Sequence, residues 1–206
     1  MLDCGCNLIH QRRRIVLTGG PGAGKTAALE LSRSMLCGHL RVLPESAGIL
    51  FGGGFPRREP AAAREAAQLA IFAVQRQLEA VEEIEEPPAI ALCDRGTLDS
   101  FAYWPGDPDR FWREVGSTRE RELSRYDAVI HMRTPGSRGG YDQRNPLRIE
   151  SASEAAAIDA RIAQAWEGHP RRSFVESSPD FLAKVRRTLD LIRDELPPCC
   201  RSPQPG

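Results

Sequence analysis

The stretch GGPGAGKT, from Gly19 to Thr26, constrains this chain more than any other part of its sequence. It matches the phosphate-binding pattern G-x-x-x-x-G-K-[ST] in full, and a loop of this kind connects a strand to a helix. The apolar run Ile15–Leu17 precedes it, and a helical pattern starts at Ala27. The alternative is a glycine-rich turn with an exposed lysine. The strand pattern before the loop and the helical pattern after it both argue against that alternative. We therefore expect a bound nucleoside triphosphate here.

Each residue type in the loop suits this ligand. Glycine lacks a Cβ, so positive φ angles at Gly19, Gly22 and Gly24 would turn amide N–H groups toward a polyphosphate. The Lys25 ammonium can reach the β- and γ-phosphates, and the Thr26 hydroxyl can ligate Mg²⁺. The predicted nucleotide-binding residues are Gly19, Gly20, Pro21, Gly22, Ala23, Gly24, Lys25 and Thr26.

Strand and helix patterns alternate along the chain, which predicts an α/β fold with a parallel sheet of about five strands in a three-layer α/β/α arrangement, as in P-loop NTPases. The expected strands are 13–18, 41–43, 89–93, 127–132 and 172–175. The expected helices are 25–37 with a cap at Gly38, 59–86, a short start at 97–104, 111–125, 153–166 with Ser153 as N-cap, and 180–196. Helix 59–86 is expected to face the sheet with Leu69, Phe72, Ala73, the stem of Arg76, Ala80 and Ile84. Helix 180–196 is expected to do so with Phe181, Val185, Leu189 and Ile192.

The length of 206 residues favours a single domain, which we place at 13–196. Residues 1–12 are expected to be a flexible lead. Residues 197–206 contain four prolines and no apolar periodicity, so we expect a disordered tail.

Charge and hydropathy exclude some function classes. The chain has 28 Lys+Arg and 28 Asp+Glu residues, so it has no net positive charge that would attract nucleic acid. No segment approaches the roughly 20 apolar residues of a membrane span, and no signal peptide is evident. We expect a cytoplasmic protein without a membrane partner, and a homodimer is left open.

Six cysteines include Cys4 and Cys6 near one end and the pair Cys199-Cys200 near the other. Together they suggest a metal site or a terminal staple, but the CxxC pairs and partner histidines of usual zinc patterns are absent. Free thiols are the preferred interpretation, with Cys37 and Cys93 as small core residues.

Acidic residues follow two of the predicted strands. Glu45 comes just after the second strand and Asp94-Arg95 directly after the third, at the edge where parallel sheets bind ligands. Asp94 is placed to touch Mg²⁺ or its waters. The alternatives are a helix-capping role for Glu45 and an internal ion pair for Asp94-Arg95.

Other polar and aromatic residues allow two readings. The segment 136–148 is rich in glycine and arginine, including Arg138, Arg144 and Arg148, and is either a lid or a solvated loop. Tyr103-Trp104 would stack on a substrate or, preferentially, pack in the core. His131, on an apolar strand, is interpreted as a satisfied core histidine.

Several stretches together resemble a known group. These are GGPGAGKT, VLPES, AIFAVQRQLE, CDRGTLDSFAYW, YDAVIHMRTP and YDQRNPLRIES, spanning roughly 13–196. The chain resembles stand-alone P-loop proteins filed as AAA-type ATPases but laid out like deoxynucleoside and thymidylate kinases. It lacks the second-region arginine and sensor elements of hexameric AAA machines.

The resemblance implies roles by position. Glu45 would be the general base on a substrate hydroxyl, Asp94 would organise Mg²⁺, and Arg95 would contact phosphates. Arg144 and Arg148 would act from the lid on the transferred phosphoryl group. Gly96 stands where deoxynucleoside kinases usually have serine, and their base-recognition pattern is absent.

The sequence thus predicts a Mg²⁺-dependent ATP-binding kinase for a small nucleoside- or nucleotide-like acceptor. Its partners would be a nucleoside triphosphate and that small molecule. The alternative is a regulatory ATPase or GTPase switch with slow hydrolysis. No N-K-x-D element is present, which favours ATP over GTP.

Overall fold

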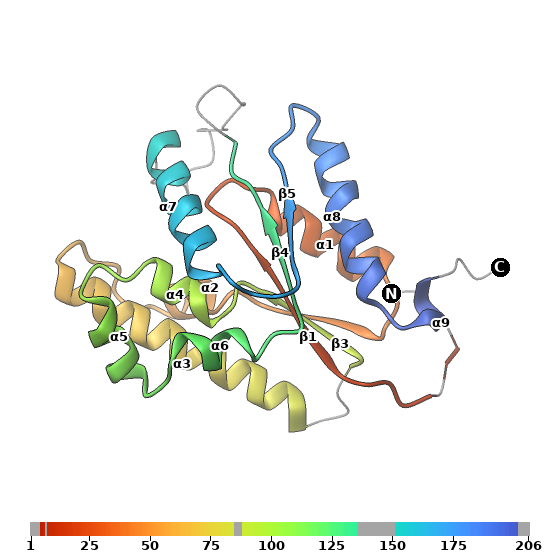
Figure 1. The fold of residues 1–206 in the computed structure, drawn as a ribbon, viewed down its shortest axis with the longest axis horizontal. Helices are drawn as coiled ribbons and strands as arrows, with labels where there is room; N and C mark the ends of the chain where they lie inside the picture. The colour runs from red at the N-terminus through yellow and green to blue at the C-terminus, as the bar shows by residue number, and fades with distance from the viewer. Residues whose placement is uncertain (1–4, 7, 85–87, 136–150, 202–206) are drawn as a thin grey trace.

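The core of the protein is one parallel sheet with strand order β2-β3-β1-β4-β5 (Figure 1). The structure is a computed structural model and describes residues 5–6, 8–84, 88–135 and 151–201. The strands are β1 (Arg13–Thr18), β2 (Leu40–Leu43), β3 (Ile90–Asp94), β4 (Ala128–Met132) and β5 (Arg172–Val175). The predicted parallel α/β fold of P-loop NTPases is confirmed.

Helices cover both faces of this sheet. They are α1 (Lys25–Met35), α2 (Ser46–Gly52), α3 (Ala61–Ile84), α4 (Thr97–Ala102), α5 (Pro108–Val115), α6 (Arg119–Leu123), α7 (Ala152–Ala165), α8 (Phe181–Glu195) and α9 (Pro198–Arg201). Figure 1 shows α1 and α8 together on one side, with α3, α4 and α7 on the other.

Successive side chains of β1 pack alternately into two hydrophobic clusters, one on each face of the sheet. Ile15 and Leu17 pack with α1 and α8 in one cluster, whereas Val16 packs with α4 and α7 in the other. All three side chains are fully buried. A strand covered on both faces needs such a continuous apolar run, which is why β1 could be recognised from sequence.

Several predicted boundaries were wrong, each for a local reason. Helix α1 ends at Met35 with Leu36 as C-cap, before Gly38. The expected helix 111–125 is two helices, because Gly116 adopts φ 62° and ends α5. The N-cap of α7 is Ser151, not Ser153: its hydroxyl accepts a bond from the Glu154 amide. Helix α2, which includes Phe51 and Gly52, lies outside every helix expected from the sequence.

The predicted buried face of α3 was wrong in part. Phe72 is buried, but Ile84 is 79% exposed, and the polar Gln75 and Glu79 are buried instead. Glu79 accepts hydrogen bonds from Gln75 and from the Tyr126 hydroxyl, 2.9 and 2.7 Å long, and pairs with Arg125. These partners satisfy the Glu79 carboxylate, which allows this polar side chain to take a core position. On α8, Phe181 is likewise 50% exposed.

The expected disorder from residue 197 is wrong for residues 198–201, which form α9. Of the tail, 202–206 lie outside the described residues, as do residues 1–4 and 7 of the expected lead. The domain limits at 13 and 196 remain a prediction. None of the helices in the described ranges is long and apolar enough to cross a membrane.

Candidate active site

The phosphate-binding loop joins β1 to α1 in the predicted way. Positive φ angles occur at Gly19, Gly22 and Gly24, as expected. At Gly19, φ is 132° and a Cβ would lie 2.0 Å from the Met132 carbonyl oxygen. At Gly20, a Cβ would lie 2.4 Å from the Thr134 hydroxyl. The first two glycines are therefore required by the close approach of β4 and α7 as well as by a ligand.

Lys25 turns back over this loop. Its Nζ donates to the carbonyl oxygens of Gly19 and Gly20, at 2.8 and 3.1 Å. Burial, helped by the positive charge of Arg95, lowers the pKa of Lys25 to about 8. A phosphate group near this ammonium would stabilise its charged form, so the site favours an anionic ligand.

Asp94, the last residue of β3, reaches the same carboxyl edge of the sheet. Its Oδ1 is buried and has no hydrogen-bond partner. Burial raises the pKa of Asp94 to about 6, against the opposing charge of Lys25. An orphaned carboxylate oxygen fits Mg²⁺ or a magnesium-bound water. Thr26, the other predicted metal ligand, is exposed at the start of α1.

Glu45 and Arg95 meet across the carboxyl ends of β2 and β3. Arg95 Nε donates to Glu45 Oε1 at 2.7 Å. Glu45 occupies the N-cap position of α2, but its side chain makes no capping bond. Burial is the largest single effect and opposes ionisation of Glu45, but the charges of Arg95 and Lys25 and the hydrogen bond from Arg95 together outweigh it and hold the pKa of this carboxyl below its ordinary value. The capping interpretation is therefore right about the position of Glu45, but no side-chain hydrogen bond supports a capping role.

Arg95 is the centre of this edge of the sheet. Its backbone has φ 69°, the one positive φ of a non-glycine residue in the part of the chain that the structure describes. Its Nη1 donates to the Gly19 carbonyl at 3.2 Å and to Asp99 Oδ1 at 3.0 Å. A strained arginine backbone persists only where its surroundings hold it, and such residues cluster at functional sites. Arg95 does form ion pairs, but with Glu45 and Asp99 and not with Asp94, so the predicted ion pair between Asp94 and Arg95 is wrong.

Sequence reasoning missed Asp99, which is buried below Arg95. It accepts bonds from the Thr18 hydroxyl at 2.6 Å, the Gly96 amide at 3.2 Å and Trp166 Nε1 at 3.0 Å. The carboxylate thereby links β1, α4 and the end of α7. Its one sequence signal was an acidic residue in the first turn of a helix, three positions after Gly96.

Asp159 on α7 was also missed. Its Oδ1 accepts from the Gly20 amide and lies against His131 Nε2, each at 2.9 Å, while Arg133 Nη1 lies 3.3 Å from Oδ2. His131 is fully buried, and its Nδ1 has no partner, so the expectation of a satisfied core histidine holds for one ring nitrogen. Asp159 therefore anchors the phosphate-binding loop to α7.

A lysine holds the other side of the loop. Lys184 Nζ, on α8, donates to the Ala23 carbonyl at 2.8 Å and to the Arg133 carbonyl at 2.5 Å. Burial lowers the pKa of Lys184 to about 8. The loop is thus fixed from both faces of the sheet.

Three arginines of the predicted lid, Arg138, Arg144 and Arg148, lie outside the described residues. Of the aromatic pair, Trp104 is buried with Phe111. Tyr103 lies beneath the Arg95 guanidinium, 5.6 Å from its ring centre. Tyr103 therefore borders the site, whereas Trp104 belongs to the core.

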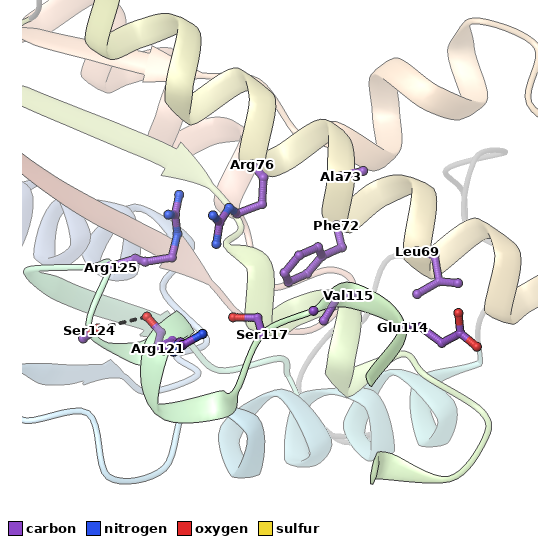
Figure 2. Close-up of a pocket in the computed structure, with 11 residues that line it drawn as sticks. Leu69, Phe72, Ala73, Arg76, Glu114, Val115, Ser117, Arg121, Ser124 and Arg125 are labelled. Atoms are coloured by element: carbon purple, nitrogen blue, oxygen red, sulfur yellow. Dashed lines mark hydrogen bonds between the residues drawn. The ribbon is translucent and has the colours of Figure 1, made fainter. Parts of the chain in front are cut away.

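A separate pocket of about 610 Å³ opens between α3 and the α5–α6 segment (Figure 2). Its walls include Phe72 and Arg76 from α3 and Ser117, Arg121 and Arg125 from the facing segment. None of the predicted nucleotide-binding or catalytic residues in the described ranges lines it. The chemistry of the P-loop edge is therefore distinct from this hollow.

Comparisons with known proteins agree with this layout. A family model described as an AAA domain matches residues 14–182. The structure of deoxyadenosine kinase from M. mycoides with bound dATP has a TM-score of 0.58 at 14% identity, covering 88% of this chain and 99% of that one. Thymidylate kinase from Candida albicans has a TM-score of 0.55 at 12% identity, covering 92% and 96%. No curated protein sequence matches the chain.

Proposed function

This chain belongs to the AAA-domain family, and from that premise we propose that it is a Mg²⁺-dependent kinase that moves the γ-phosphoryl group of ATP to a hydroxyl of a small nucleoside- or nucleotide-like acceptor. The shared fold of a deoxyadenosine kinase and a thymidylate kinase supports this choice. At such low identity that likeness bears on the fold, so the argument for activity rests on the site itself.

One observation carries the proposal: the Glu45 carboxylate is held 2.7 Å from Arg95, at the sheet edge that also bears Lys25 and Asp94. A switch that only hydrolyses ATP slowly has no need of a second carboxylate directed by an arginine. A kinase needs one to orient an acceptor hydroxyl and take its proton.

The residues would divide the work as follows. The amides of 19–24 and the Lys25 ammonium bind the β- and γ-phosphates. Thr26 and Asp94 would hold Mg²⁺, which would neutralise part of the phosphate charge when bound. Arg144 and Arg148 would bring guanidinium groups to the equatorial oxygens and exclude water.

Arg95 would couple nucleotide binding to the base. While it pairs with Glu45, the pKa of that carboxyl stays low, which makes Glu45 a weak base. A guanidinium that turns toward an arriving phosphate loosens this pair, and the basicity of Glu45 rises. The base would therefore be strongest when ATP is in place.

The test compares Glu45→Gln with Lys25→Ala in two assays, ATP affinity and phosphoryl transfer to a pool of nucleosides and nucleotides. Glu45→Gln should lower transfer by about 10²–10⁴-fold while ATP affinity changes little. Lys25→Ala should lose ATP binding itself. If Glu45→Gln retains full turnover, the kinase assignment fails and a regulatory ATPase replaces it. Unchanged ATP affinity in Lys25→Ala would remove the nucleotide site.

A further inference from the structure

Both ends of the described chain meet at one group of thiols and imidazoles. Cys6 and His10 lie in the segment before β1, His39 lies just before β2, and Cys199 lies in α9. One ligand atom from each of these four side chains falls within 4.8 Å of all the others. No sequence pattern links histidines to the terminal cysteines, because His10 and His39 come close to Cys199 only in the folded chain.

The separations suit a tetrahedral metal. His10 Nε2 lies 3.4 Å from Cys6 Sγ and 3.3 Å from Cys199 Sγ. In a zinc site with Zn–N near 2.0 Å and Zn–S near 2.3 Å, neighbouring ligand atoms are about 3.5 Å apart. The rings of His10 and His39 meet edge to face, with centroids 4.8 Å apart. Both imidazoles can therefore direct a nitrogen toward one point.

Hydrogen bonding alone accounts for these contacts poorly. An imidazole nitrogen carries either one proton or one in-plane lone pair, so it makes one good hydrogen bond. Yet two sulfur atoms approach His10 Nε2, and two more, of Cys37 and Cys200, lie 3.3 and 3.2 Å from His39 Nδ1. The two thiols that crowd His10 Nε2, those of Cys6 and Cys199, are arranged as expected when one cation draws them together.

We propose that Cys6, His10, His39 and Cys199 bind one structural Zn²⁺ ion that ties the two ends of the chain to the lead of β2. Mixed thiolate and imidazole ligands favour zinc over Mg²⁺ or Ca²⁺, which take oxygen ligands. Cys37, His39 and Cys200 form an overlapping second group. This group would act as a thiol-rich neighbour of the site.

The position of the cluster indicates a structural role. His10 and His39 precede the amino ends of β1 and β2, whereas the phosphate-binding loop follows the carboxyl end of β1. The cluster therefore lies at the opposite edge of the sheet from the P-loop. Figure 1 shows the start of the described chain and α9 on that side, close together.

Such a clamp also explains α9. A helix of four residues is not stable on its own, and the sequence around it predicted disorder. The contact between Cys199 and His10 joins residues 189 positions apart. A metal that closes so long a loop and is bound only by the folded chain stabilises the fold.

The experiment uses the full chain, purified without chelator, and counts metals by mass spectrometry. We expect about one zinc per chain. Removing it with a strong chelator should lower the Tm, and adding zinc alone should restore it. Replacement by Co²⁺ should give the visible bands of a tetrahedral site and a thiolate charge-transfer band.

Two variants and two controls locate the ligands. Cys199→Ser and His10→Ala should each lower zinc affinity by more than about 100-fold, beyond the loss expected for an outer-shell contact. Cys93→Ala, which changes a buried thiol in β3, and Cys200→Ser should keep one zinc. Because affinity is measured on protein that circular dichroism shows to be folded, and chelator removal needs no variant, poor folding of one variant does not block the test.

Any one of four results would overturn the proposal. Wild-type protein could hold far less than one zinc after incubation with excess zinc and washing. The His10→Ala and Cys199→Ser variants could retain wild-type zinc affinity. Two zinc ions per chain, or loss of zinc in Cys200→Ser but not in Cys199→Ser, would contradict the ligand set named here.

Discussion

Arg95 Nε lies 2.7 Å from Glu45 Oε1, so the residue that follows β3 holds the carboxylate that follows β2. The same guanidinium contacts the Gly19 carbonyl and Asp99. One side chain thus joins the phosphate-binding loop to the proposed base. This relationship makes Arg95 the most informative position to change.

Arg95→Lys should impair transfer more than binding. Lysine keeps the charge but cannot span three acceptors in a fixed plane, so Glu45 loses its orientation. We expect a fall of about 10²-fold in transfer rate, because small displacements of catalytic groups cost about this much. Steady-state kinetics beside ATP titration checks it. Equal losses in rate and ATP affinity would show that Arg95 only binds the ground state.

Asp94→Asn should stabilise the ligand-free protein at pH 7 and weaken binding of Mg²⁺·ATP. The pKa of Asp94 is raised from 3.8 to about 6 in the folded chain, so its favourable contribution is complete below 3.8 and is lost as pH rises through about 6. At pH 7 the ligand-free Asn variant should be more stable than wild type, by up to about 3 kcal/mol. It should also bind Mg²⁺·ATP more weakly.

Denaturant unfolding of the ligand-free Asp94→Asn variant at pH 4.5 and pH 7 measures the first effect, and calorimetry measures the second. Wild type should lose stability relative to the variant between these pH values. The same pH dependence in both proteins would mean that Asp94 is not a buried carboxylate with a raised pKa.

Gly19→Ala should disrupt the loop, whereas Gly116→Ala is its matched control. Both glycines have positive φ, but a Cβ at Gly19 would lie 2.0 Å from the Met132 oxygen, and one at Gly116 meets nothing within 4 Å. We expect Gly19→Ala to cost about 3 kcal/mol or more of stability. Gly116→Ala should cost about 1–2 kcal/mol and leave ATP binding intact. Equal Tm shifts in the two variants would argue against the steric account.

Lys184→Met should change how stability depends on pH. The pKa of Lys184 falls from 10.5 to about 8 on folding, so the unfolded chain holds more protons between these values and wild-type stability rises across that window. A neutral amine still has two N–H groups for the Ala23 and Arg133 carbonyls. The free energy of unfolding of the Met variant should be about 1–3 kcal/mol lower than that of wild type, and it should increase less as the pH rises. Parallel stability curves from pH 7.5 to 10.5 would contradict this.

Some of the site could be predicted because its chemistry is local in sequence. The loop 19–26 can be recognised from residue types at fixed spacing. Strands β1 and β3 can be recognised from continuous apolar runs that end beside this loop. Parallel strands then bring Glu45 and Asp94 to one edge without any knowledge of side-chain packing. The roles of these residues remain proposals.

The remaining features depend on contacts that no local pattern records. Asp99 and Asp159 matter because Trp166, Gly20 and His131 come to them from distant segments. The buried face of α3 could not be predicted fully, because it includes Glu79, whose charge is paired with Arg125 inside the core. His10 and Cys199 likewise become neighbours only through the fold.

The central claim, transfer of a phosphoryl group to a small acceptor, is tested most directly by following the γ-phosphoryl group of ATP. The protein is incubated with Mg²⁺, ATP and a pooled library of nucleosides, nucleotides and other small hydroxyl metabolites, against a control without acceptor, and products are identified by mass. We predict a gain of one phosphoryl group on one acceptor or a few related ones, with ADP formed in equal amount. Inorganic phosphate alone, released at the same slow rate with and without the library, would contradict the account.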